Sequence, residues 1–225
     1  MYPITIHGRH YVVSSDESGG AGGAGGLAGA CARGASPYGY PNIIDITDEK
    51  NPTIVAKLKL EVSDAANCNL MLGDPPDKGA GAPAYNDERC VANRPDNPTM
   101  LACSFQNAGL RVFDISDLAH PKEIAYYKPP APRDAILPGS GSWSPGVDLT
   151  VDRIAGYARW QKVVPGGNKA KQNGNANGNG NGNGNDNKDP QFEIWTISDG
   201  NGFQVLRFSD DFVASHRDLF KNPDN

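Results

Sequence analysis

Gly109-Leu110-Arg111-Val112-Phe113-Asp114-Ile115-Ser116-Asp117 carries the strongest fold signal in this chain. Apolar residues typical of β-strands occupy its first half, and the polar residues at its end can hydrogen-bond the nearby backbone and set a turn. Pro121 follows and restricts the backbone where the next apolar run, Glu123–Tyr127, begins. These residues predict a pair of antiparallel strands, one unit of a meander.

This unit recurs along the chain. Ile44-Asp45-Ile46-Thr47-Asp48 matches Phe113–Asp117 at a spacing of 69 residues, and a proline follows each at the same offset. A weaker third copy, Val205–Asp210, matches Val112–Asp117 at a spacing of 93. The longer spacing is close to what an Asn-Gly insertion upstream would add, and insertions in repeat proteins collect in loops. The sequence therefore predicts repeat-containing segments at about 1–62, 63–129 and 130–212.

Other short apolar runs bounded by turn residues predict further strands. Gly and Pro number 27 and 18, which argues against a helical bundle because both residues are costly inside helices. One short helix is expected at Phe212–Phe220, and Met1–His7 resembles the start of a strand. The expected strands are His10–Ser14, Asn42–Ile46, Ile54–Leu60, Met100–Phe105, Leu110–Ile115, Glu123–Tyr127, Phe192–Ile197 and Phe203–Phe208.

Two low-complexity stretches are expected to be flexible insertions, at 18–30 and 166–189. The first centres on Gly19–Gly26 and the second on the Asn-Gly alternation of Asn173–Asn187. Neither centre has large apolar side chains to bury. A glycine-rich loop holds phosphate when a strand precedes it and a helix follows, and no helical pattern follows either stretch. We expect no nucleotide site and no cofactor.

The repeat resembles that of the LVIVD-repeat β-propeller proteins. Gly109–Asp117 with Pro121–Tyr127 is the strongest part of the resemblance, and Asn42–Asp48 and Ile194–Phe208 also look like this family. The resemblance implies an all-β fold, a β-propeller or partial propeller built of antiparallel meander repeats. It also implies a protein of a kind often exported by bacteria, with its activity largely unassigned. Glu88-Arg89-Cys90 departs from the family's His-Tyr-Cys-like strand start, so no histidine ligand is carried over.

A propeller usually contains four to eight blades of four strands each. Because about three repeats are present, we expect the chain to be a C-terminal portion of a larger propeller or a truncated product. An open arc of blades exposes sheet edges, which other blades or another copy of the chain could cover.

Four cysteines are present and none forms a Cys-x-x-Cys pair, which argues against a zinc knuckle. Cys90 and Cys103 flank the turn-forming segment Asn93–Pro98 symmetrically, so a hairpin would place them face to face. Cys31 and Cys68 are then left to pair. Two disulfides are favoured over four buried thiols, because an even cysteine count in a loop-rich chain is typical of an oxidising compartment.

No catalytic, cofactor-binding or metal-binding residues are predicted. His7 and His10 are three apart and would face opposite sides of a strand. Asp199-Gly200-Asn201-Gly202 lacks the ligand pattern of a calcium loop, and a type I′ hairpin turn explains Asn201-Gly202. Four aspartates recur with the repeat, which favours a structural turn over catalysis: Asp45, Asp48, Asp114 and Asp117.

Charge and hydropathy exclude other classes. The formal net charge is −5 and no basic stripe is present, which argues against a nucleic-acid partner. No window of about 18 apolar residues is present, so no membrane span is predicted. Met1–His7 does not read as a signal peptide. We expect an extracellular or periplasmic protein whose export signal lies upstream.

Three functional hypotheses follow. The first is a non-enzymatic binding or scaffold propeller for an unknown protein or small-molecule ligand. The second is an enzyme, a hydrolase or oxidoreductase, with its site at the central channel of the complete propeller; this hypothesis rests on fold analogy. The third is a partial product without independent function.

Overall fold

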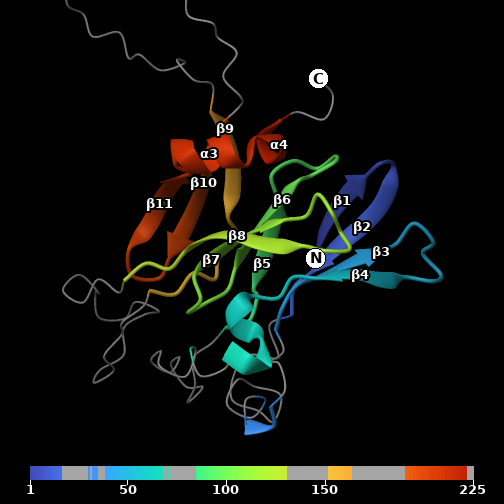
Figure 1. Cartoon of the computed structure of the whole chain (residues 1–225), viewed down its shortest axis with the longest axis horizontal. Helices are drawn as coiled ribbons and strands as arrows, with labels where there is room; N and C mark the ends of the chain where they lie inside the picture. The colour runs from blue at the N-terminus through green and yellow to red at the C-terminus, as the bar shows by residue number, and fades with distance from the viewer. Residues whose placement is uncertain are drawn as a thin grey trace, which may run out of the picture.

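The computed structural model describes residues 1–16, 30, 32–34, 39–67, 70, 85–130, 152–163 and 191–221. The described part is mostly β and contains three antiparallel meander sheets, with the second sheet between the other two (Figure 1). Both predicted insertions fall outside the described residues, apart from Ala30. None of the described helices is long and apolar enough to cross a membrane.

Each sheet is formed by strands that follow one another in the sequence. The first contains β1 (Tyr2–Ile6), β2 (Arg9–Ser14), β3 (Asn42–Asp45) and β4 (Thr53–Lys57). The second contains β5 (Arg89–Ala92), β6 (Met100–Ser104), β7 (Leu110–Asp114) and β8 (Lys122–Tyr127), and the third contains β9 (Arg159–Val163), β10 (Gln191–Ser198) and β11 (Gly202–Arg207). The helical elements whose bounds fall within the described residues are η1 (Glu61–Ser63), η2 (Ala65–Asn67), α3 (Asp210–Ser215) and α4 (Arg217–Phe220).

All eight strands expected from the apolar runs are present, and the N-terminal residues form β1. The apolar runs did not mark β5 or β9, because β5 has only four residues and β9 carries three polar residues among five. The hairpin expected around Cys90 and Cys103 had nevertheless implied a strand at β5. The helix expected at Phe212–Phe220 is found as α3 and α4, separated at His216. Ser209 caps α3 by accepting the N–H of Phe212 at 3.2 Å.

The repeat predicted from the 69-residue spacing extends to fine detail. β3 and β4 change register between Ile43 and Ile44, and β7 and β8 change register between Val112 and Phe113. These positions are equivalent at the spacing of 69, so both sheets carry the same irregularity. The first and second sheets are therefore structural copies in their outer halves.

The four repeated aspartates hold the turns after β3 and β7. Oδ1 of Asp45 accepts the N–H of Thr47 at 2.9 Å, and Oδ1 of Asp114 accepts the N–H of Ser116 at the same distance. Asp48 and Asp117 then accept from the backbone two residues on, at 3.1 and 2.9 Å. These side chain-to-backbone bonds replace ladder bonds where each strand ends.

Strands β6 and β7, the inner pair of the second sheet, are buried on both faces. All five residues of β6 are buried, and alternate side chains point to opposite sides of the strand. Leu101, Cys103 and Phe113 pack in a cluster shared with the first sheet. Met100, Ala102 and Val112 pack in a second cluster shared with the third sheet and the C-terminal helices.

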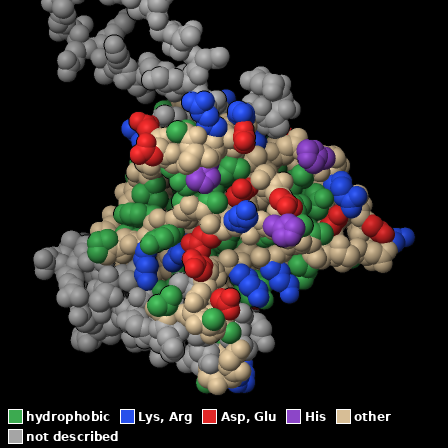
Figure 2. Space-filling model, in the orientation of Figure 1, with side chains coloured by type: hydrophobic (Ala, Val, Ile, Leu, Met, Phe, Trp, Pro, Cys, Tyr) green, Lys and Arg blue, Asp and Glu red, His purple; other side chains and the backbone are tan. Residues whose placement is uncertain are grey.

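Charged side chains of both signs are interspersed over the face seen in Figure 2. Hydrophobic side chains gather on the side of this face where β10 and β11 lie. Strand β11 carries two exposed hydrophobic residues, Phe203 at 62% and Val205 at 46% exposure.

The three first strands lie next to one another, since β1 contacts β5 and β5 contacts β9. The N–H of Thr5 in β1 donates to the carbonyl of Pro95 at 3.0 Å, and the N–H of Asn97 donates back to Thr5 at 2.7 Å. Nε1 of Trp160 in β9 donates to the carbonyl of Val91 in β5 at 2.9 Å. The sheets thus converge on their first strands.

The turn between β10 and β11 corrects one expectation. Ser198 pairs with Gly202 across a three-residue connection, and Gly202 has a positive φ of 72° while Asn201 does not. A type I′ turn needs positive φ at both central residues, so that prediction was wrong. The buried carboxylate of Asp152 accepts the N–H groups of Gly200 and Asn201, each at 2.7 Å. This distant residue selects the turn.

Gly109 is a position where only glycine fits. Its φ is +79°, and an added Cβ would overlap the carbonyl of Tyr127 and lie 2.9 Å from Cα of Lys128. Gly8 has a similar φ of +76° with open space around the Cβ position. We expect Gly109→Ala to lower the free energy of unfolding by about 2 kcal/mol more than Gly8→Ala, since both suffer the φ strain but only Gly109 also suffers the clash. Equal losses in urea titrations would contradict this expectation.

Candidate functional site

A hollow of about 230 Å³ lies where the first and second sheets meet the residues leading into β9. Its lining is mostly polar and draws on all three parts of the molecule. We call it the inner hollow, and its lining residues are Met1, Tyr2, Val13, Ser15, Glu88, Arg89, Cys90 and Tyr157. Arg89 stacks over the ring of Tyr157, with 5.4 Å between the guanidinium carbon and the ring centroid.

A run of buried polar residues, Asn86-Asp87-Glu88, leads into β5 beside this hollow. The three residues are at most 5% exposed. The N–H of Asp87 donates to the carbonyl of Gly39 at 2.7 Å, and the N–H of Glu88 donates to the carbonyl of Ser104 at 2.9 Å. The backbone of this run is therefore fixed between the chain entering β3 and the end of β6.

Glu88 is held by cationic and amide groups. Nε2 of Gln106 donates to its Oε1, and Nη2 of Arg153 lies 3.5 Å from the same oxygen. Nη1 of Arg89 lies 3.6 Å from Oε2. Gln106 occupies the turn between β6 and β7 with a positive φ of 47°. Glu88 thus ties the second sheet to the segment that precedes β9.

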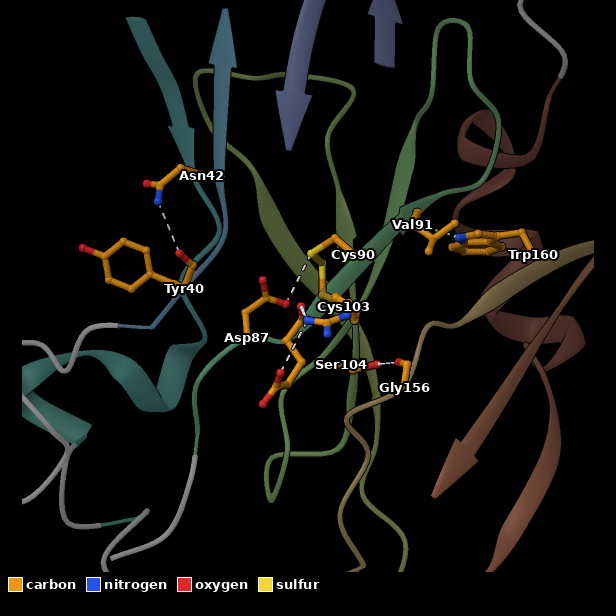
Figure 3. The surroundings of a disulfide bond; sticks show 11 residues. Tyr40, Asn42, Asp87, Cys90, Val91, Cys103, Ser104, Gly156 and Trp160 are labelled. Carbon is orange, nitrogen blue, oxygen red and sulfur yellow. Dashed lines mark hydrogen bonds and ion pairs between the residues drawn. A yellow bond between two sulfur atoms is a disulfide. The ribbon is translucent and has the colours of Figure 1, made fainter. Parts of the chain in front are cut away.

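Asp87 has a different environment, because no cation contacts it among the described residues. Its Oδ1 lies 3.5 Å from Sγ of Cys90, and its Oδ2 has no hydrogen-bond partner in the described part of the chain. Figure 3 shows the carboxyl directed toward the Cys90–Cys103 bond. Burial raises the pKa of Asp87 to about 7, and the nearby charge of Glu88 acts in the same direction, while the hydroxyl of Ser15 opposes the shift.

The disulfide between Cys90 and Cys103 is confirmed. The two residues are direct partners in the β5–β6 register, with an S–S distance of 2.03 Å. Both are buried, at 3% and 0% exposure. Cys31 and Cys68 lie outside the described residues, so their pairing stays a prediction.

Removing this disulfide is expected to lower the free energy of unfolding by about 3 kcal/mol. The cysteines are 13 residues apart, and a loop of similar length costs the unfolded chain about that much entropy when closed. The variant is Cys90→Ala/Cys103→Ala, compared with its parent by urea titration in a Cys31→Ser/Cys68→Ser background. A decrease in the free energy of unfolding below about 1 kcal/mol would show that the disulfide does not stabilise the β5–β6 hairpin.

The sequence did not predict the inner hollow as a site, and of its lining residues only Cys90 was a predicted site residue, as a disulfide partner. The one sequence feature that could have indicated this site is the polar run Asn86–Glu88, directly before a cysteine-containing strand. Polar residues in a connecting segment normally indicate a solvent-exposed loop, so this run did not suggest a buried site. The predicted turn aspartates do hold turns. Asp45 also forms an ion pair with Arg9, with 2.5 Å between Nη2 of Arg9 and Oδ2 of Asp45. This pairing lowers the pKa of Asp45 to about 2. His7 and His10 are both exposed.

No protein-family model matches this chain, and no curated protein matches it.

Proposed function

We propose that this chain is part of a β-propeller of the LVIVD-repeat kind and acts as a non-enzymatic binding or scaffold protein outside the cytoplasm. Its ligand, a small polar molecule or a segment of another protein, would bind in the inner hollow. A nucleic-acid partner and a membrane span form no part of the proposal.

The fold supports the propeller part of this proposal. Three successive meanders, each starting from a strand that neighbours the first strand of the next, are what blades arranged around an axis require. The shared register shifts and turn bonds of the first two sheets support one repeated unit. The Cys90–Cys103 bond supports an oxidising compartment.

The single observation that carries the binding proposal is the inner hollow itself. Polar and aromatic groups from three separate segments converge there, and such convergence is typical of sites that orient a ligand. Tyr157 is 61% exposed and stacked on Arg89, so it presents an aromatic edge and a cation together.

A matched pair of variants tests this site. Tyr126 also stacks on an arginine, Arg111, and is 67% exposed, but it lies on β8 away from the inner hollow's lining. Polar small molecules and short peptides would be screened by amide chemical-shift mapping, and the affinity of each hit measured by calorimetry. We expect Tyr157→Ala to weaken binding at least tenfold, about 1.4 kcal/mol, and Tyr126→Ala to leave it unchanged. Hits that map to β8, or equal losses in both variants, would refute the site.

One observation favours the enzyme as a second candidate. Asp87, with its pKa raised to about 7, lies one residue from the ionic network of Glu88, and such paired carboxyls can divide acid and base roles. Turnover of a hit compound that Asp87→Asn abolishes, with binding retained, would establish this alternative over pure binding.

The proposed partner of the fold is the remaining blades or another copy of the chain. Among the described residues, no strand pairs with the outer side of β11, where Phe203 and Val205 are exposed. Exposed strand edges favour association. Light scattering after size exclusion separates the cases: a folded dimer supports closure by a copy, and an aggregate supports missing blades. A stable, cooperatively unfolding monomer would mean that this arc needs no partner.

A further inference from the structure

Three buried side chains around the Cys90–Cys103 bond can supply donor atoms to one metal ion. One ligand atom from each of Asp87, Cys90 and Cys103 lies within 4.8 Å of the others. All three residues are buried, and no other such group of His, Cys, Asp or Glu occurs in the described part of the chain. Asp87 reaches the sulfur atoms from the loop before β5, while the cysteines face each other on β5 and β6 (Figure 3).

The oxidised protein leaves Asp87 poorly satisfied. Its side chain is fully buried, its Oδ2 has no hydrogen-bond partner among the described residues, and its Oδ1 lies 3.5 Å from Sγ of Cys90, an atom that carries no proton in the disulfide. Burying a carboxyl without a cation or full hydrogen bonding is costly. A bound divalent cation would satisfy both the carboxylate and two cysteine thiolates.

We propose that reduction of the Cys90–Cys103 bond creates a binding site for Zn²⁺, a thiophilic divalent cation. Both thiolates and the carboxylate of Asp87 would hold the ion. Reduction by a phosphine with water yields two thiols and the phosphine oxide. Binding of the ion then releases the two thiol protons, together with the proton of any neutral Asp87.

The donor set suits this ion. Zn²⁺ binds thiolate sulfur at about 2.3 Å and carboxylate oxygen at about 2.0–2.2 Å in tetrahedral sites, so donors around one ion lie roughly 3.5–4 Å apart. Oδ1 of Asp87 already lies 3.5 Å from Sγ of Cys90, and the two sulfurs, 2.03 Å apart in the disulfide, would separate to a similar spacing after reduction. Thiolate ligands select Zn²⁺ over Mg²⁺ and Ca²⁺, which prefer oxygen.

The inner hollow supplies the fourth position and the route of entry. Cys90 and Ser15 both line it, so this is the side from which water and the reductant would approach the buried sulfur atoms. Two thiolates and one carboxylate leave the zinc complex with one net negative charge. Arg89 also lines the hollow and interacts electrostatically with Asp87, so it can balance part of that charge.

The test is cobalt and zinc titration of the full chain carrying Cys31→Ser/Cys68→Ser, before and after reduction. The phosphine would be removed by gel filtration under argon. We expect one Co²⁺ per reduced chain with thiolate-to-cobalt charge-transfer absorption, displaced by one equivalent of Zn²⁺, and no such absorption in the oxidised chain. Zinc should also raise the melting temperature of the reduced chain.

Asp87→Asn keeps both thiols and removes the carboxylate, so it should weaken zinc binding tenfold or more, since loss of even an outer-shell partner costs about 10–100-fold. The matched control is Asp211→Asn, an exposed acid in the first turn of α3, which should change nothing. Circular dichroism of each reduced variant verifies that it is folded. No charge-transfer absorption in a folded reduced chain, or equal zinc affinity in Asp87→Asn and its parent, would overturn the proposal.

Discussion

Asp87→Asn is expected to raise the free energy of unfolding by roughly 4 kcal/mol at pH 8 and to change it little at pH 4, measured without metal. The pKa of Asp87 is about 7 in the folded protein, against an ordinary value of 3.8. Between these two values the folded chain binds the proton that the unfolded chain releases. Stability contributed by the neutral carboxyl is therefore present below about pH 4 and is lost as the pH rises through 7.

The measurement is the difference in unfolding free energy between the variant and its parent, from urea titrations at several pH values with a chelator present. Asp45→Asn is the control of opposite sign, since pairing with Arg9 lowers the pKa of Asp45 to about 2. Stability from Asp45 is present above its unfolded pKa and lost as the pH falls toward 2. If the difference in unfolding free energy between Asp87→Asn and its parent is constant across pH 4–8, the carboxyl of Asp87 is solvated. That result would contradict its buried position.

Phe113→Ala is expected to lower the free energy of unfolding by about 3–5 kcal/mol, the range for removing a buried aromatic side chain. Phe113 is 1% exposed and packs against Phe105, with 6.0 Å between the ring centroids. It belongs to the cluster that joins the first two sheets, so the vacated space lies at their interface. Well-packed cores relax only partly around such a cavity.

Phe203→Ala is the matched control, because Phe203 is also on a strand and is 62% exposed. It should cost less than about 1 kcal/mol, as surface substitutions generally do. Both variants would be compared by urea titration with unfolding followed by circular dichroism. Similar losses would indicate that the first two sheets do not share one core.

Both results bear on how the sheets depend on one another. Phe113 tests the interface between two repeats, whereas Asp87 tests a loop whose environment comes from several segments. In a repeat protein, each unit is stabilised largely by its neighbours, so damage at an interface should destabilise both of the sheets that meet there. The change in unfolding free energy caused by Asp87→Asn should depend on pH, because a carboxyl group is removed. The change caused by Phe113→Ala should not depend on pH.

The strand and turn pattern could be predicted because its causes are local. Asp45 and Asp114 bond backbone groups two residues away, and the apolar runs between turns carry the period of a strand. The Cys90–Cys103 pairing followed from the symmetric placement of the cysteines about one turn, and hairpin geometry leaves little choice there. The sequence alone therefore specified the meander units, their repetition and the Cys90–Cys103 disulfide.

Tertiary structure decided the environment of each buried polar group, and with it the candidate site. Asp87 is positioned by Gly39 and influenced by Ser15, residues that are distant in sequence and belong to the first repeat. Asp152 selects the turn at Gly200 and Asn201 from about 48 residues away. A carboxyl's pKa and a turn's type depend on burial and on partners brought together by packing. No periodicity or local propensity encodes those partners, so the inner hollow emerged only when the three sheets were assembled.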